Sequence, residues 1–310
     1  MSQLDSHAFP SIETATGVSQ NIQKWIQENQ YRLMHEVDQC GAVLLRGFPL
    51  KSDLDFDAVV AEFGLTAFTY EESLSNAVRN NRTDKVFTAN EAPPDIEIFL
   101  HHEMAQTPLY PRKLFFFCET AADEGGATAL CRSDLLLEAM KSQMLHFVEQ
   151  CRAAGLRYTN IMPAEADAES GQGRSWKSTL SCDNREQAES RLAELGYDWY
   201  WQEDGSLKAT TPVMPAIRSL ESGVEVFFNQ LIAAFMGWKD ARNSGEKSVS
   251  FGDGSEIKDE DMQQVTQLAE ELTFDLQWQN GDLALVDNFM VMHGRRPFRG
   301  QRCVLASFAT

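Results

Sequence analysis

No linker, repeat or low-complexity tract divides the chain, although strand-like and helix-like segments alternate along almost all of its 310 residues. Apolar residues recur at helical spacing over residues 18–40, and the apolar run GAVLLRGF follows as a buried strand. Further strands are indicated at KLFFFCET, DLALVD and CVLASFA. With 43% hydrophobic residues, the chain can bury a sizeable core. We therefore expect one domain of mixed strands and helices over residues 18–310, after a flexible polar segment over residues 1–17.

The charge and the distribution of apolar residues narrow the class of protein. A formal net charge of -19 argues against nucleic acid and anionic membranes as partners. No apolar run approaches the roughly 18 residues of a membrane span, and the first residues lack the basic-then-apolar profile of a signal peptide. The six cysteines form no CxxC pair, so neither a zinc knuckle nor a disulfide scaffold is indicated. We expect a cytoplasmic protein with reduced, mostly buried thiols.

Two widely separated segments indicate a metal site. In FLHHEMAQ, His101 and Glu103 lie two apart on a predicted strand, so their side chains project from the same face and that of His102 points the other way. His293 follows the predicted strand DLALVD. Two imidazoles and one carboxylate form the facial triad that leaves three positions of an octahedral Fe(II) open for cosubstrate and oxygen. Taken alone, His101 and Glu103 have a simpler interpretation as a solvated pair on an edge strand. His293 alone has a simpler interpretation as a hydrogen-bonded core histidine.

A triad of this kind that uses 2-oxoglutarate also needs a cation for the far carboxylate of the cosubstrate, and the planar fork of arginine suits that task. Arg302 lies nine residues after His293 and begins the predicted strand RCVLASFA, which we expect next to the strand that leads to His293. Thr128, in EGGATALCR, would add a hydroxyl donor. A surface ion pair is the alternative for any single arginine, and there are three competing arginines nearby: Arg295, Arg296 and Arg299.

Taken in order, these motifs resemble those of the Fe(II)/2-oxoglutarate dioxygenases of the taurine dioxygenase and clavaminate synthase superfamily. The match runs through GAVLLRGF, LHHEMAQ, KLFFFCETAADEGGATALCRSD, GDLALVDNFMVMHGRRPF and GQRCVL. The resemblance implies a mixed α/β fold dominated by β-structure, with helices around a double-stranded β-helix (jelly-roll) core. It also implies that Fe(II), 2-oxoglutarate and O2 are used. By matching positions, the iron ligands would be His101, Glu103 and His293, and the 2-oxoglutarate anchors Arg302 and Thr128.

Within the superfamily, EAPPD before the H-x-E pair and VFFNQ resemble the branch typified by the syringomycin-type aspartyl β-hydroxylase. This resemblance implies hydroxylation of an aliphatic C–H in an amino acid or amino-acid-derived substrate of natural-product biosynthesis, free or tethered to a carrier protein. Taurine dioxygenase has a sulfonate-binding arginine where this chain has Ala306, which argues against a sulfonate substrate. Halogenases of related fold have a small residue in place of the carboxylate ligand, which lets chloride bind the iron. The presence of Glu103 therefore favours hydroxylation over halogenation.

Substrate contacts are less sharply indicated. Asn229 and Gln230 in VFFNQ, with Arg79 or Arg82 in the polar loop before the H-x-E pair, could bind the carboxylate and amide groups of an amino acid. Solvated loop residues are the simpler interpretation of both arginines. A lid-like insertion is expected around residues 160–215. The oxidised carbon, the exact substrate and the oligomeric state stay open.

Three alternative functions remain. The same cofactors could serve desaturation or cyclisation of a small carboxylate-bearing metabolite. A metal-binding jelly-roll protein without turnover is possible, although such a protein should have lost a ligand or the arginine. A zinc hydrolase would also accept two histidines and a glutamate, but it would have no need of Arg302 or Thr128.

Overall fold

The computed structural model of the chain describes residues 8–15, 21–71, 73–75, 77, 79–89, 91–167, 173–237 and 248–310. The largest sheet has seven strands along the path β1-β2-β16-β6-β19-β3, with β4 pairing separately to β19. Its strands are β1 (Ser11–Thr14), β2 (Ala42–Arg46), β3 (Ala67–Phe68), β4 (Phe87–Thr88), β6 (Lys113–Thr120), β16 (Leu283–Asp287) and β19 (Cys303–Ala309).

A second sheet of four strands runs in the order β15-β8-β17-β5. It faces the first sheet, because Phe116 of β6 and Leu130 of β8 belong to one buried apolar cluster. Its strands are β5 (Ile98–His101), β8 (Thr128–Arg132), β15 (Thr273–Leu276) and β17 (Val291–Arg295). Two short ladders complete this part of the chain: β7 (Glu124–Gly125) with β18 (Phe298–Arg299), and β12 (Arg218–Ser219) with β13 (Glu225–Val226).

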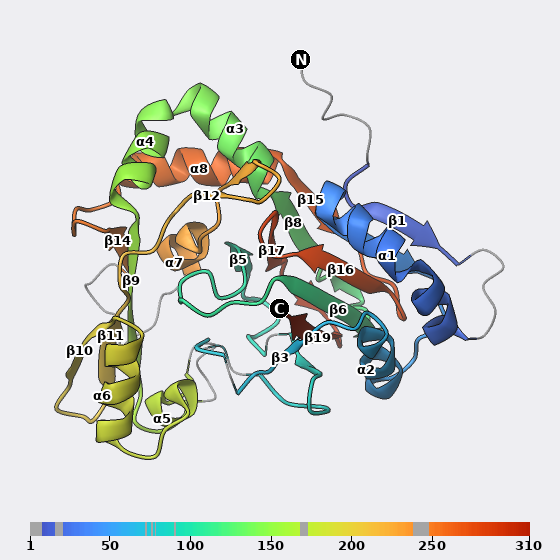
Figure 1. Cartoon of the computed structure of the whole chain (residues 1–310), viewed down its shortest axis with the longest axis horizontal. Helices are drawn as coiled ribbons and strands as arrows, with labels where there is room; N and C mark the ends of the chain where they lie inside the picture. The colour runs from blue at the N-terminus through green and yellow to red at the C-terminus, as the bar shows by residue number, and fades with distance from the viewer. Residues whose placement is uncertain are drawn as a thin grey trace.

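Helices cover the outer faces of the two sheets (Figure 1). Successive strand residues point to opposite faces, so Phe115 and Phe117 of β6 pack against α1 and α2, on the far side from Phe116. On β8, Cys131 likewise turns away from Leu130 and packs with α3, α4, α7 and α8. No helix in the described ranges is long and apolar enough to cross a membrane. The helices named here are α1 (Ile22–Cys40), α2 (Asp53–Ala61), α3 (Ser133–Gln143), α4 (Leu145–Ala154), α7 (Leu231–Gly237) and α8 (Asp259–Glu271).

The insertion, defined as the segment from β9 to β11, lies at the end of the molecule opposite α1 and α2 (Figure 1). Its sheet runs β10-β11-β9-β14, and Trp176 and Trp201 meet edge to face in a separate apolar cluster. The Arg174 guanidinium donates to the carbonyls of Ser73 and Ser75, which ties the insertion to the polar loop before the second sheet. Its elements are β9 (Leu156–Met162), α5 (Trp176–Leu180), α6 (Arg185–Glu194), β10 (Asp198–Trp201) and β11 (Leu207–Thr210), and β14 (Val249–Phe251), from later in the chain, pairs with β9.

The predicted mixture of strands and helices is confirmed, but two predictions are wrong. Residues 1–17 are not all loose, because Ser11–Thr14 form β1 and pair in parallel with β2; residues 1–7 and 16–17 lie outside the described part. The strand that Arg302 precedes is also not adjacent to the one that leads to His293. Strand β6 lies between β16 and β19, and His293 itself lies on β17 of the second sheet.

Candidate active site

Inward-facing side chains of the two sheets surround a pocket of about 460 Å³ that is partly open to solvent. We call it the triad pocket. The strands supply alternate residues to it, so Thr128 lines the pocket from β8 while its neighbour Ala129 packs outward. The charged and hydroxyl-bearing residues that line it are Arg79, His101, Glu103, Thr128, His293, Arg295 and Arg302.

His101, Glu103 and His293 converge in this pocket. Their ligand atoms all lie within 4.8 Å of one another. The Nε2 atom of His293 is 3.5 Å from Oε2 of Glu103, and the two imidazole centroids are 4.3 Å apart. His101 and His293 are register partners on the antiparallel strands β5 and β17. Cross-strand pairing therefore joins two histidines that are 192 positions apart in the sequence.

Glu103 reaches the pocket by a route that differs from the prediction. Strand β5 ends at His101, so Glu103 lies in the turn that follows rather than on a strand. Asn288 holds this turn: its Oδ1 accepts from the Glu103 amide at 2.7 Å, and its Nδ2 donates to the Glu103 carbonyl at 3.0 Å. Asn288 is fully buried. The predicted convergence is therefore correct, but the reason given for it is not.

The two histidines of the H-x-E motif have different environments. The Nδ1 of His101 lies 2.8 Å from the Phe99 carbonyl. Burial, followed by repulsion from His293, lowers the pKa of His101 to about 4. The ring is therefore neutral, Nδ1 carries the proton, and Nε2 is available as a metal ligand.

His102 points away from the pocket, as predicted. Its Nδ1 and Nε2 lie 2.5 and 3.1 Å from the carbonyls of Asn288 and Phe227. A neutral imidazole can donate to only one of these carbonyls. Burial lowers the pKa of His102 to about 3, so the ring is neutral and its shorter contact is the donated bond. His102 thus stabilises the strand end that carries His101.

Arg79 enters the pocket from the polar loop and pairs with Glu103. One nitrogen, Nη2, lies 2.9 and 3.0 Å from the two carboxylate oxygens, and both side chains are about 95% buried. Burial alone would raise the pKa of Glu103, but Arg79, His293 and His101 outweigh it and lower the pKa well below its usual range. The Nη1 of Arg79 is buried and has no partner among the described residues. A solvated loop arginine is therefore the wrong interpretation of Arg79.

Arg302 and Thr128 meet on another side of the same pocket. The Nε of Arg302 donates to the Gly126 carbonyl at 2.9 Å, and Nη2 lies 3.5 Å from the Thr128 hydroxyl. Burial lowers the pKa of Arg302 to about 10, so the group stays cationic at neutral pH. Within the described ranges it has no ion-pair partner, unlike Arg296 and Arg299, which pair with acids away from the pocket. Arg302 is thus a partly buried cation without a counter-ion among the described residues.

The remaining candidates lie outside the pocket or are occupied. Arg82 pairs with Asp53 and Glu119 on the surface. Asn229 donates to the Ala216 carbonyl, and Gln230 donates to the His102 carbonyl. Both amides are buried and support the backbone behind the triad. Arg295 lines the pocket but uses three bonds to hold the backbone carbonyls of Ala92, Pro93 and Ile96.

Three positioning residues escaped the sequence analysis, although all lie in quoted motifs. Asn288 in VDNFM clamps the Glu103 turn, as described above. A Cβ on Gly294 would lie 2.5 Å from the Ile98 carbonyl, so glycine lets β17 approach β5 beside His293. Gly126 has φ +69°, and a Cβ there would lie 3.0 Å from Cδ of Arg302. The available sequence signal was that Gly294 directly follows His293 and that Gly126 lies two residues before Thr128, whereas Asn288 lies five residues before His293.

The chain matches the family described as taurine catabolism dioxygenase TauD, TfdA family, over residues 6–307. The chain belongs to this family. A clavaminate synthase-like protein of Arabidopsis thaliana is 42% identical over 276 residues, covering 89% of this chain and 82% of that protein. This TauD-family protein is therefore an Fe(II)/2-oxoglutarate-dependent dioxygenase. Fe(II) and 2-oxoglutarate are typical of the family, and His101, Glu103 and His293 form the triad.

More distant relatives extend the comparison. The dapdiamide synthesis protein DdaC of Enterobacter agglomerans is 26% identical over 289 residues, which is 87% of this chain and 83% of that protein. An asparagine oxygenase structure with Fe(II), 3-hydroxyasparagine and succinate has a TM-score of 0.56 at 13% identity, covering 92% of this chain and 79% of the other. The structure of AAD-2 with Mn(II) and N-oxalylglycine has a TM-score of 0.54 at 12% identity, with coverages of 96% and 94%. At these identities the two structures show a shared fold alone.

Proposed function

We propose that this TauD-family protein hydroxylates an aliphatic C–H of a small amino acid or amino-acid-derived substrate. The single observation that carries the cosubstrate assignment is the partly buried cation of Arg302, which lies in the same pocket as the triad and has no ion-pair partner among the described residues. A cation that is partly removed from water is stabilised by a nearby anion, and the carboxylate of 2-oxoglutarate would supply one. The reaction would consume 2-oxoglutarate and O2, release succinate and CO2, and transfer one oxygen atom to the substrate.

His101, Glu103 and His293 would hold Fe(II), because two imidazoles and one carboxylate suit this metal and leave positions open. The donor atoms fit: the Phe99 carbonyl directs Nε2 of His101 toward the pocket, and Asn288 fixes the turn of Glu103. When bound, iron supplies the oxygen chemistry that side chains cannot perform. The protein's part is to hold these three groups and to shield the pocket from water.

Arg302 and Thr128 would bind the distal carboxylate of 2-oxoglutarate. The indole N–H of Trp278 donates to Thr128 Oγ1 at 2.9 Å, so the threonine's own hydroxyl hydrogen is free to donate to a carboxylate. The guanidinium nitrogens of Arg302 that do not donate to the Gly126 carbonyl can donate to the same carboxylate. These two residues therefore form a short row of donors for one anionic end.

Arg79 is the substrate-binding candidate that this pocket favours. Its buried Nη1 has no partner among the described residues and would donate to the carboxylate of an amino-acid-like substrate. The proposed substrate class is in keeping with a dapdiamide synthesis protein among the relatives, and with an asparagine oxygenase of the same fold that is bound to 3-hydroxyasparagine. A natural-product role and a place in the syringomycin-type branch belong to the same proposal. Desaturation or cyclisation is the alternative outcome.

We also infer that the two facing sheets are the two halves of a double-stranded β-helix. The triad and the 2-oxoglutarate anchors all lie between them, with His293 on β17, Thr128 on β8 and Arg302 just before β19. A structure with iron and a 2-oxoglutarate analogue would test this inference together with the anchor assignment.

The test of the function is succinate release by purified protein given Fe(II), 2-oxoglutarate and O2, with amino acids and their derivatives screened for stimulation. A stimulating substrate should gain one atom of labelled oxygen from O2, measured by mass spectrometry. Iron binding without succinate release under any condition would favour the non-catalytic metal-binding protein. Zinc-dependent hydrolysis without 2-oxoglutarate would favour the hydrolase.

A further inference from the structure

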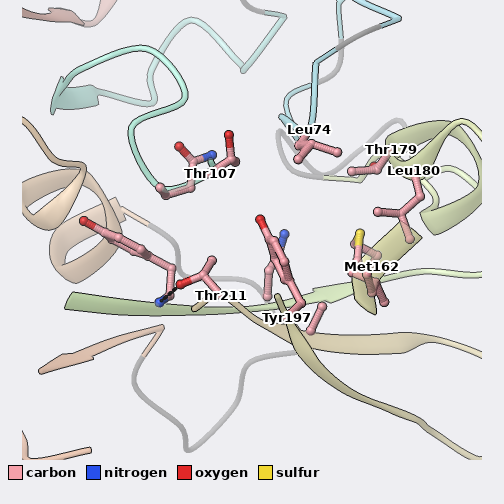
Figure 2. A pocket seen from close by; sticks show the side chains of 12 residues that line it. Leu74, Thr107, Met162, Thr179, Leu180, Tyr197 and Thr211 are labelled. Carbon is pink, nitrogen blue, oxygen red and sulfur yellow. Dashed lines mark hydrogen bonds between the residues drawn. The ribbon is translucent and has the colours of Figure 1, made fainter. Parts of the chain in front are cut away.

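A second pocket of about 480 Å³, partly open to solvent, lies where the insertion meets the turn after Glu103. We call it the insertion pocket. Figure 2 shows Met162, Thr179 and Leu180 of the insertion on one side and Thr107 on the other, with the Tyr197 ring projecting between them.

The lining of the insertion pocket is uncharged. None of the 12 described residues that surround it is acidic or basic. Apolar walls come from the β9–β11 sheet, from α5 and α6, and from Leu74 of the polar loop. Burial raises the pKa of the Tyr197 hydroxyl, which keeps that group neutral. An ion would lose its hydration here without gaining a counter-charge, so the lining selects an uncharged ligand.

Two polar atoms in this lining have unmet hydrogen bonds. The hydroxyl of Thr179, a residue only 3% exposed, has no partner in the described part of the chain, and neither does Oε1 of Gln106. Two other hydroxyls of the pocket are satisfied: Thr211 accepts from the Tyr158 amide, and Thr107 donates to backbone carbonyls. Buried polar atoms are nearly always paired in folded proteins. These two unpaired atoms belong to residues that line one cavity, where a ligand could bond both.

The chemistry of these two atoms defines the ligand. Oε1 of Gln106 can only accept, so the ligand must carry a donor. The Thr179 hydroxyl can donate to a carbonyl. A carboxamide offers both an N–H and a C=O in one uncharged group, and the apolar walls suit a short branched aliphatic chain attached to it.

The insertion pocket also borders the triad. Gln106 lies three residues after Glu103 in the turn that Asn288 holds. Consecutive Cα atoms are 3.8 Å apart, so the Cα atoms of Glu103 and Gln106 are separated by at most about 11 Å. The two pockets are therefore close along the chain, although they share no lining residue.

We propose that the insertion pocket binds an uncharged aliphatic carboxamide through Gln106 and Thr179. The ligand is either the non-reacting end of the substrate or a separate small molecule of the same chemistry. If the ligand is the end of the substrate, the inference rests on the proposed oxygenase function. If it is a separate small molecule, the inference is independent of that function.

The probe for the test is 4-methylpentanamide, followed by methyl NMR of the full-length protein with labelled methionine and leucine methyl groups. The signals of Met162 and Leu180 should shift and saturate, whereas 4-methylpentanoate, the charged isostere, should leave them unmoved. Thr179→Val keeps the side-chain shape and should weaken amide binding about two- to tenfold, the value of one hydrogen bond. Thr266→Val is the matched control, because Thr266 also has a buried, unpartnered hydroxyl but lies on α8, outside the pocket.

This test reads binding directly and needs no turnover, so its outcome is separate from that of the oxygenase assay. Absence of saturable shifts, or equal affinity of wild type and Thr179→Val, would overturn the proposal. Equal binding of the amide and the acid would overturn it as well. If the site is confirmed, succinate release distinguishes the two sources: stimulation by the probe identifies the substrate's end, and an unchanged rate identifies a separate ligand.

Discussion

The triad pocket and the insertion pocket have similar volumes, about 460 and 480 Å³, and lie on either side of one turn, but their chemistry is opposite. Three arginines, two histidines and a glutamate line the first, whereas the 12 described residues around the second carry no charge. In each pocket, however, buried polar atoms lack partners among the described residues: Arg79 Nη1, His293 Nδ1 and Arg295 Nε in the first, and Thr179 Oγ1 and Gln106 Oε1 in the second. These unpaired atoms are the observations on which the two proposals rest, an anionic ligand for the first pocket and a neutral amide for the second.

Loss of a triad ligand should have the largest effect of all the substitutions. This effect should be confined to the triad pocket. His293→Ala removes one of three ligands, and changing even an outer partner of a ligand costs about 10–100-fold. We expect more than about a 100-fold loss of succinate release, with little bound iron and an unchanged fold. Iron content, succinate release and circular dichroism would be measured together, with Thr266→Val as the control. A variant with normal iron content and activity would remove His293 from the triad.

Arg79→Met should destabilise the metal-free protein strongly, because it leaves the buried carboxylate of Glu103 without its ion-pair partner. Breaking such a pair costs about 3–5 kcal/mol. Added Mn(II) should restore much of this stability, since the cation replaces the guanidinium beside Glu103. The matched change is Arg152→Met, which breaks an exposed pair with Glu225 worth about 0–1 kcal/mol. Denaturant unfolding with and without metal would measure both, and equal losses would contradict the buried-pair interpretation.

Arg302→Lys tests whether the unpaired cation binds 2-oxoglutarate. A point charge replaces a two-pronged donor, and weakening a buried charge pair costs about 2–5 kcal/mol. The apparent affinity for 2-oxoglutarate should fall accordingly while metal affinity is retained. Arg299→Lys provides the comparison, because Arg299 is exposed and pairs with Glu124. An unchanged requirement for 2-oxoglutarate in the Arg302 variant would reject Arg302 as the anchor.

The sequence predicted elements best where apolar periodicity is long. Helix α1 and strands β6, β16 and β19 lie where their patterns indicate. Strand β1 was missed because its residues, SIET, carry almost no apolar signal and the strand is defined by backbone pairing with β2. Local patterns report local burial, so an edge strand with a polar sequence is invisible to them.

The site was predicted in composition but not in geometry. His101, Glu103 and His293 were identified together, yet the turn that carries Glu103 depends on Asn288, which is 185 positions away in the sequence. Similarly, Arg79 and Arg82 lie in the same polar loop, and only the folded chain shows that one meets Glu103 while the other meets Asp53. Contacts across such separations are set by the packing of the two sheets and leave no local signature.

A smaller effect is expected from the hydroxyl beside the anchoring arginine. Thr128→Val removes one hydrogen bond from the proposed 2-oxoglutarate site, which is worth about 0.5–1.5 kcal/mol. The affinity for 2-oxoglutarate should fall about two- to tenfold at unchanged maximal succinate release. Titration of 2-oxoglutarate at saturating iron would measure this. A fall as large as that of Arg302→Lys would mean that the substitution disturbs the pocket, and no fall would remove Thr128 from the anchor.

The smallest effect is expected for the stability of Thr179→Val, which we compare with that of Thr107→Val in the same insertion pocket. Thr179→Val removes a buried hydroxyl that has no partner, and an apolar group of the same shape should leave stability equal or raise it by up to about 1 kcal/mol. Thr107→Val removes a hydroxyl that lies 2.6 Å from the Leu109 carbonyl and 3.1 Å from that of Met104, so it should cost about 1–3 kcal/mol. Thermal and denaturant unfolding of both variants would measure the difference. A loss for Thr179→Val as large as that for Thr107→Val would show that its hydroxyl stabilises the fold and is not left free for a ligand.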